Sequence, residues 1–227
     1  MAAARPPAVV FDLDGTVWDS APGIVGAMEA TLAELGLPHP GDDVLRRALG
    51  PPLLELLVEI GVPRDRLDEG RLTYRRHYQA TGETACVPYP GIAELLDDLR
   101  AEGVLLATAT SKGVEVAVRM LEHFDLARRF DVVEAASMTQ AGHDKVQVIG
   151  AALAGLQGIT PGPLDGAAPA VMVGDRSFDI DGGRHHGLRT IGVRWGYAPP
   201  GELEAAAPDA IVDTVAGLAD QLSRHGE

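Results

Sequence analysis

The chain has 227 residues, of which 46% are hydrophobic, and a formal net charge of −14 at pH 7. A chain of this length can bury one good hydrophobic core, or one core together with a small accessory domain. The strong negative charge argues against nucleic acid and against an anionic membrane surface as partners, because both attract basic proteins.

Short apolar segments along the chain predict the strands of a sheet. Amphipathic patterns between the later segments predict helices over residues 92–103, 114–124 and 145–156. Near-continuous apolar strands that alternate with helices are typical of a parallel sheet covered by helices on both faces. We therefore predict an α/β fold with a Rossmann-like parallel core. The predicted strands are residues 8–13, 104–110, 130–136, 170–175, 190–195 and 210–213.

The segment between the first and second predicted strands has a different character. Most of residues 20–87 reads as helix, with no strand pattern, and helices are predicted over 22–35, 53–60 and 65–80. This pattern indicates an all-helical insertion after the first strand of the sheet. We therefore predict two domains, residues 20–87 and the remainder of the chain.

Signals for export or membrane insertion are not evident. The first residues carry no long apolar segment ahead of their first acidic residue, and no stretch approaches about 18 apolar residues. The single cysteine, Cys86, excludes an internal disulfide and a thiolate metal cluster. We expect a cytoplasmic protein.

The sequence FDLDGT, residues 11–16, follows the first apolar segment. It places Asp12 and Asp14 at the carboxyl end of a predicted strand, the edge at which open α/β sheets bind ligands. The alternative is an Asp-Gly turn with a second acid nearby. Four specified positions arise by chance in such a chain with a probability on the order of one in a thousand. FDLDGT therefore indicates a functional site.

Three further features are predicted at the same edge of the sheet. Thr110 and Ser111 end the second apolar segment and offer a hydroxyl and backbone N–H groups to an anion. Lys145, one of only two lysines in the chain, opens a predicted helix, and Asp175 ends another strand with Asp179 one helical turn later. Each has an ordinary reading alone, such as a helix cap or a solvated lysine. Those readings do not explain why parallel strands deliver the whole set to one edge.

These motifs resemble a known set. FDLDGT, TSK (110–112), the lone Lys145 and GDRSFD (174–179) are similar to the four motifs of the haloacid dehalogenase superfamily. GPPL (50–53) and YPGI (89–92) resemble its phosphoglycolate phosphatase-like branch, in which a helical cap is inserted after the first strand. The resemblance covers nearly the whole chain. It implies a catalytic core of residues 1–19 and 88–227 and a mobile helical cap of residues 20–87.

The resemblance also implies a Mg²⁺-dependent phosphatase that hydrolyses a small phosphorylated metabolite through an aspartyl-phosphate. Asp12 would be the nucleophile. Asp14 would be the general acid for the leaving alcohol and then the general base for water. Thr110, the backbone of Ser111 and Lys145 would bind the phosphoryl group. Positioning and charge neutralisation of this kind are what phosphoryl transfer requires.

The metal site implied by the resemblance consists of oxygen atoms, which Mg²⁺ prefers. Asp12, the backbone carbonyl of Asp14 and Asp175 would ligate the ion, and Asp179 would support this site or reach the ion through water. The family often has proline after the motif lysine, where this chain has Val146. No role for Arg176 follows from the pattern.

Alternatives to a phosphatase remain open from sequence. A sugar phosphomutase would use the same core with a cap that keeps water from the aspartyl-phosphate. A non-catalytic binding protein on this fold is a second alternative, although every motif acid is present. A phosphonatase-like enzyme is excluded because residues 20–87 contain no lysine for a Schiff base. The sequence does not name the metabolite, and it is compatible with a monomer or a homodimer.

Overall fold

The computed structural model describes residues 6–51, 53–136, 145–159 and 170–223. The chain divides into two compact units. One comprises Met1–Val17 and Pro88–Glu227, and the other comprises Trp18–Val87. No helix in the described ranges combines the length and the apolar character needed to cross a lipid bilayer.

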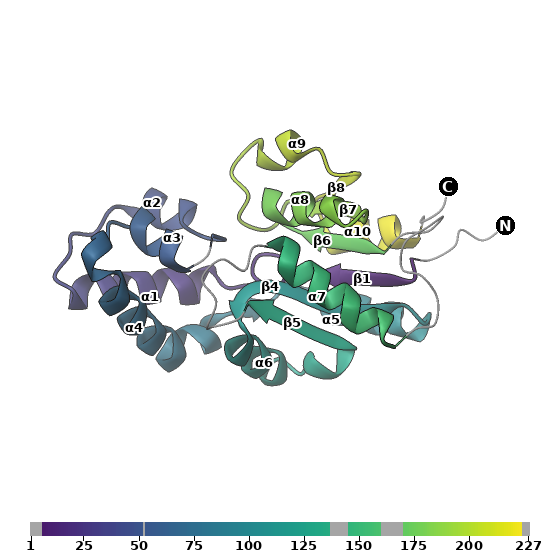
Figure 1. The fold of residues 1–227 in the computed structure, drawn as a ribbon, viewed down its shortest axis with the longest axis horizontal. Helices are drawn as coiled ribbons and strands as arrows, with labels where there is room; N and C mark the ends of the chain where they lie inside the picture. Colours follow the sequence, from purple (N-terminus) through teal and green to yellow (C-terminus); the bar gives the residue numbers. More distant parts are fainter. Residues whose placement is uncertain (1–5, 52, 137–144, 160–169, 224–227) are drawn as a thin grey trace. The chain divides into compact units, whose positions relative to one another are not determined.

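The first unit contains a six-stranded sheet with the order β5-β4-β1-β6-β7-β8 (Figure 1). All neighbouring strands are parallel. The chain adds β4 and β5 on one side of β1 and then β6, β7 and β8 on the other, so β1 borders the point where the strand order reverses. This sheet confirms the predicted α/β fold, and each predicted strand has a counterpart. The strands are β1 (Ala8–Phe11), β4 (Leu105–Gly113), β5 (Val132–Ala136), β6 (Val171–Gly174), β7 (Arg189–Val193) and β8 (Ala210–Val212).

Helices connect these strands, as parallel pairing requires. The three helices predicted after residue 90 are confirmed as α5, α6 and α7. In chain order the helices of this unit are α5 (Ile92–Ala101), α6 (Val114–His123), the short η4 (Ala127–Arg129), α7 (Lys145–Gln157), α8 (Ser177–His185), α9 (Glu202–Ala206) and α10 (Val215–Ser223).

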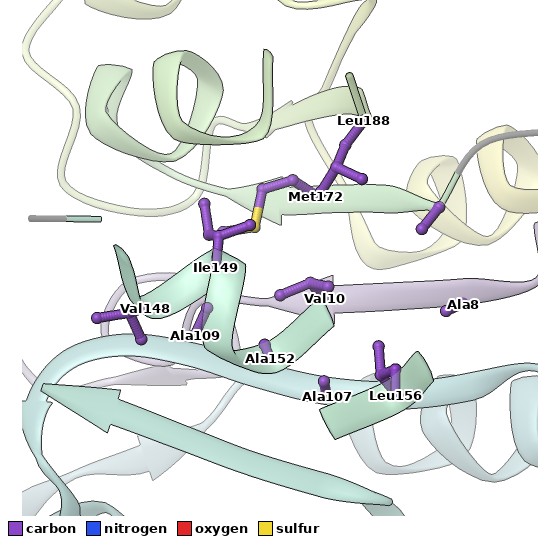
Figure 2. Close-up of a cluster of buried hydrophobic side chains, with 11 residues drawn as sticks. Ala8, Val10, Ala107, Ala109, Val148, Ile149, Ala152, Leu156, Met172 and Leu188 are labelled. Carbon is purple, nitrogen blue, oxygen red and sulfur yellow. The ribbon is translucent and has the colours of Figure 1, made fainter. Parts of the chain in front are cut away.

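A buried hydrophobic cluster fixes α7 over the central strands (Figure 2). Alternate residues of a strand share a face, so Val10 of β1 and the small Ala107 and Ala109 of β4 lie on the face that α7 covers. Ile149 and Ala152 of α7 are completely buried against them. Because alanine side chains let the helix approach closely, α7 packs mainly on β4 and β5 and also contacts β1. Its first residue, Lys145, is thereby placed near the carboxyl ends of those strands.

The second unit is helical between two short strands, β2 (Trp18–Asp19) and β3 (Val87–Pro88), which pair with each other. The sequence predicts a single helix over 65–80. In the structure this segment is divided among a 3-10 helix, an α-helix and a π-helix. The π-helical turn brings Gly82 against α1, where a Cβ atom on Gly23 would lie 2.1 Å from the Gly82 carbonyl oxygen. The remaining elements are α1 (Ala21–Glu34), α2 (Asp42–Arg47), α3 (Leu53–Glu59), η1 (Arg64–Arg66), α4 (Leu67–His77), the π-helix η2 (Tyr78–Gly82) and η3 (Glu83–Ala85).

Candidate active site

The central strands bring the predicted site residues to one edge of the sheet. Phe11 of β1 is level with Thr108 of β4 and with Val173 of β6. Asp12, the next residue after β1, donates its backbone N–H to the Val173 carbonyl at 2.9 Å. Asp175 follows β6 directly. The two acids therefore lie side by side because their strands are neighbours and end at the same level.

Three carboxylates meet at this edge. Asp12, Asp175 and Asp179 each offer one oxygen, and these oxygens lie within 4.8 Å of one another. All three residues are buried, with exposed fractions of 6%, 1% and 1%. Among the described residues, Asp175 Oδ1 has no hydrogen-bond partner. Crowded carboxylates repel one another, and a buried acceptor without a donor is costly, so this donor set fits a hard cation such as Mg²⁺.

Lys145 supplies one positive charge to the acid cluster. Its Nζ lies 2.5 Å from Asp12 Oδ1 and 2.8 Å from Asp179 Oδ1, and it donates to the Ala109 carbonyl at 2.7 Å. Asp12 Oδ1 and the Ala109 carbonyl accept hydrogen bonds from the ammonium, whereas Asp179 Oδ1 forms an ion pair with it and accepts no hydrogen bond within the described ranges. The Lys145 side chain is only 7% exposed. It therefore acts as a fixed countercharge to Asp12.

The pKa values of these groups reflect burial and mutual repulsion. Burial raises the pKa of Asp12 to about 7; Lys145 opposes this rise and the charge of Asp179 adds to it. Burial also holds the pKa of Asp175 well above its ordinary value, with the charges of Asp12 and Asp179 adding to the effect. Burial alone would lower the pKa of Lys145, but the charges of Asp12 and Asp179 outweigh it and raise that pKa. The one positive charge of Lys145 does not neutralise the negative charges that the three acids carry when they are ionised.

Backbone donors and glycines orient the second and third acids. The backbone N–H of Tyr197 donates to Asp175 Oδ2 at 2.6 Å, and that of Arg176 donates to Asp179 Oδ2 at 3.0 Å. A Cβ atom on Gly174 would lie 2.2 Å from Asp179 Cγ, and Gly15, whose φ is +83°, would place one 2.3 Å from Asp175 Oδ2. The Gly15 of FDLDGT is thus required both by its backbone conformation and by its contact with Asp175.

The other lysine of the chain meets the second acid of FDLDGT. Lys112 Nζ lies 3.1 Å from Asp14 Oδ2, and the two side chains are 8% and 19% exposed. Sequence reasoning gave Lys112 no role. The signal that could have found it is composition, because the chain has only two lysines and both contact an acid of the same motif.

The phosphate-binding residues predicted on β4 have a different local structure from the one expected. β4 continues to Gly113, beyond its predicted end at residue 110, and carries an irregularity between Thr110 and Gly113, while the next helix begins at Val114 as predicted. Thr110 Oγ1 accepts a hydrogen bond from the backbone N–H of Lys112 at 3.2 Å. Within the described ranges, neither Thr110 nor Ser111 hydrogen-bonds to the acid cluster. The register of β4 brings both to the correct edge, and their role stays a prediction.

A family model for haloacid dehalogenase-like hydrolases matches residues 9–193. The chain therefore belongs to the haloacid dehalogenase-like hydrolase family. Its similarity to individual proteins of known name places it in the phosphoglycolate phosphatase-like branch of that family.

Three such relatives are informative. The chain is 42% identical to the tyrosine-protein kinase PtkA of Mycobacterium tuberculosis over 85% of its own length, but it spans only 63% of that relative. The solved structure of PtkA covers 97% of the chain, which covers 99% of that structure, with a TM-score of 0.83 and 37% identity. A 5′-nucleotidase of Pseudomonas aeruginosa is 32% identical, with 99% of both chains covered. A phosphoglycolate phosphatase of Cupriavidus necator is 33% identical, with 93% of this chain and 90% of the relative covered.

Proposed function

We propose that this protein is a Mg²⁺-dependent phosphatase that hydrolyses a small phosphate monoester through an aspartyl-phosphate on Asp12. The observation that carries this proposal is the buried Asp12 carboxylate, paired at 2.5 Å with Lys145 and crowded by Asp175 and Asp179. A structural salt bridge needs one acid and one base. Three buried acids around one lysine favour a site that also holds a cation.

The residues that would hold Mg²⁺ are Asp12, Asp175 through its unpartnered Oδ1, and the backbone carbonyl of Asp14. Asp179 would support the site from Lys145 and the start of α8. When bound, the ion would neutralise charge on the phosphoryl oxygens and reduce their repulsion of the nucleophile.

In the first step, a carboxylate oxygen of Asp12 attacks phosphorus and the bond from phosphorus to the ester oxygen breaks. Asp14 gives a proton to the leaving oxygen. Thr110 and the backbone N–H of Ser111 bind the phosphoryl oxygens, and Lys145 holds Asp12 in place. The products are the alcohol and an acyl phosphate on Asp12.

In the second step, Asp14, now a carboxylate, takes a proton from water. The water oxygen attacks phosphorus, the bond between phosphorus and Asp12 breaks, and inorganic phosphate leaves. Lys112, 3.1 Å from Asp14 Oδ2, orients this acid for both proton transfers. The cycle restores both carboxyl groups.

The class of substrate is supported by the relatives. The two that the chain matches over nearly their whole length are named a 5′-nucleotidase and a phosphoglycolate phosphatase, which favours a small phosphorylated metabolite. The helical unit Trp18–Val87 contains none of the acids or lysines named above, and we assign it the part of the cap domain. These relatives also disfavour the non-catalytic alternative.

Transfer of phosphate to tyrosine is a second candidate. The observation in its favour is the 42% identity to a protein named as a tyrosine kinase. We rank this activity below hydrolysis, because the two relatives that the chain matches over nearly their whole length are named a 5′-nucleotidase and a phosphoglycolate phosphatase.

The deciding experiment is a panel of phosphorylated metabolites assayed with Mg²⁺, and with ATP plus a tyrosine peptide. Release of inorganic phosphate supports the phosphatase, an isomerised sugar phosphate supports the mutase, and phosphotyrosine supports the kinase.

Asp12→Asn should lower kcat more than about 100-fold, or about 2.7 kcal/mol of barrier. It should also abolish the covalent phosphate seen by rapid quench. Asp98→Asn, on the exposed face of α5, is the control. Unchanged turnover in Asp12→Asn would refute the assignment of the nucleophile.

A further inference from the structure

Arg176 lies between two acids of the cluster, Asp175 and Asp179, but its side chain serves another contact. Arg176 Nε donates to Glu202 Oε1 at 2.9 Å, and the backbone N–H of Ser177 donates to the same oxygen at 2.8 Å. The side chains of Arg176 and Glu202 are 11% and 17% exposed. A largely desolvated ion pair with an additional N–H donor is stronger than a surface pair. Glu202 therefore ties the first residue of α9 to the start of α8.

The segment that leads into α9 orients Asp175. Tyr197, in the connection between β7 and α9, donates its backbone N–H to Asp175 Oδ2 at 2.6 Å. A Cβ atom on Gly196 would lie 2.3 Å from Asp175 Oδ2, so the backbone lies directly on this carboxylate. With Oδ2 engaged there, Oδ1 is the oxygen without a hydrogen-bond partner in the described ranges.

This connection is fixed at its two ends. Near its beginning, Trp195 Nε1 donates to the Thr16 carbonyl at 3.1 Å, and the Tyr89 hydroxyl donates to the Trp195 carbonyl at 3.1 Å. Near its end, Glu202 ties the first residue of α9 to the start of α8, and Arg184 of α8 donates to the Ala206 and Ala207 carbonyls at the far end of α9. If the Glu202 tie were lost, the end of α9 that is nearer to Tyr197 in the chain would lose its hydrogen bonds to α8.

We propose that Glu202 is a positioning residue for the Mg²⁺ site. By joining α9 to the start of α8, it keeps the backbone of Tyr197 on Asp175 Oδ2, so that Oδ1 is presented to the ion. Arg176 is the partner through which Glu202 acts. This inference rests on the proposed function, because it assumes that Asp175 ligates Mg²⁺. Groups that orient metal ligands commonly change metal affinity when they are replaced.

The test is titration of the full-length protein with MgCl₂ by calorimetry, without substrate. Glu202→Ala should weaken Mg²⁺ binding about tenfold, the lower end of effects seen for such supporting groups, and Glu202→Gln should weaken it less. The matched control is Glu204→Ala, on the same helix. Glu204 pairs with Arg194 at 2.8 Å, and both side chains are about half exposed. Its Mg²⁺ affinity should equal that of the wild type.

Kinetics separate positioning from general damage. In Glu202→Ala the Mg²⁺ concentration needed for half-maximal rate should rise about tenfold, while kcat at saturating Mg²⁺ returns to near the wild-type value. Thermal unfolding in EDTA identifies any variant that fails to fold. If Glu202→Ala does not fold, the test is made with Glu202→Gln, which keeps the shape of the side chain.

Wild-type Mg²⁺ affinity in folded Glu202→Ala would overturn the inference and leave the proposed function intact. An equal loss in Glu204→Ala would also overturn it, because the effect would then belong to α9 as a whole. A wild-type protein that bound no Mg²⁺ would refute the metal site itself, and this inference with it.

Discussion

At the scale of residues, each of the two lysines in the chain pairs with one acid of FDLDGT. Lys145 is paired with Asp12 and Lys112 with Asp14. Arginine is far more frequent in this chain, yet a planar guanidinium could not fill the place of Lys145. A compact ammonium can approach the three oxygens around it, two by hydrogen bonds and Asp179 Oδ1 as an ion pair.

Replacing each lysine by methionine should have different effects on stability. Lys145→Met leaves a buried carboxylate without its countercharge and should lower the free energy of unfolding by about 3 kcal/mol. Lys112→Met affects a more exposed pair and should cost about 1 kcal/mol. Urea denaturation in EDTA measures both. The double variant Asp12→Asn with Lys145→Met should recover part of the loss, and equal costs for the two single variants would contradict this account.

The raised pKa of Asp12 predicts that Mg²⁺ binding releases protons. Ligation requires ionised carboxylates, and without metal the Asp12 pKa is about 7, with that of Asp175 also raised. Affinity should therefore increase as pH rises from about 6 to about 8, by up to about tenfold per pH unit for each proton displaced. Calorimetry in two buffers of different ionisation enthalpy counts the protons. Affinity independent of pH and of buffer would contradict the prediction.

Without metal, the raised pKa of Asp12 should make the folding stability of the protein decrease as pH rises. The folded pKa of Asp12 lies above its ordinary value of 3.8, so the folded state holds this proton more tightly than the unfolded state does. The resulting stabilisation is complete at low pH and is lost as pH rises toward about 7. Mg²⁺ should therefore stabilise the protein most at the upper end of this range.

At the scale of elements, the site depends on a strand that ends in a glycine, because the missing side chain leaves room for an acid of the cluster. Gly174 ends β6, and its missing Cβ leaves room for Asp179 from the first turn of α8. Gly26 inside α1 differs, because nothing lies within 4 Å of where its Cβ would be, so this glycine only adds flexibility to the unfolded chain. The neighbours of each glycine in space therefore decide what it contributes.

Two glycine substitutions test this distinction. Gly174→Ala would place Cβ 2.2 Å from Asp179 Cγ; we expect a loss of about 1–3 kcal/mol in unfolding free energy and weaker Mg²⁺ binding. Gly26→Ala in α1, where nothing lies within 4 Å of the new atom, should stabilise the protein by up to about 1 kcal/mol. Urea denaturation and calorimetry measure the two quantities. Tolerance of Gly174→Ala with full Mg²⁺ affinity would mean that Asp179 has room to move.

At the scale of the whole molecule, screening of the net charge by salt and the proposed binding of Mg²⁺ should both stabilise the folded chain. A chain with a net charge of −14 is destabilised by self-repulsion, which salt screens. The acid cluster adds a local concentration of the same charge. Screening by any salt and the proposed binding of Mg²⁺ at the cluster should therefore make two separate contributions to stability.

Thermal unfolding at matched ionic strength separates these contributions. NaCl should raise Tm as the Debye length falls from about 30 Å at about 0.01 M to about 8 Å at about 0.15 M. MgCl₂ at the same ionic strength should raise Tm further. In Asp175→Asn the NaCl effect should persist and the additional effect of MgCl₂ should be lost. Identical curves for the two salts in the wild type would argue against a specific site.

The sequence by itself determined the order of the six strands of the large sheet and of helices α5, α6 and α7, and the positions of the acids in FDLDGT and GDRSFD. Both follow from local rules, because apolar periodicity reports which face of an element is buried. A doubly wound sheet then brings strand ends to one edge. The sequence did not show where β4 ends, because an irregularity in a strand leaves no periodic pattern of apolar residues.

Only the tertiary structure decided which charged groups meet. Lys145 and Asp12 are 133 positions apart, and Arg176 and Glu202 are 26 apart. Such pairs depend on how α7 packs on β1 and β4 and how α9 is joined to α8, which no local pattern records. The same holds for the unpartnered oxygen of Asp175, because whether a buried group has a donor is a property of its neighbours in space.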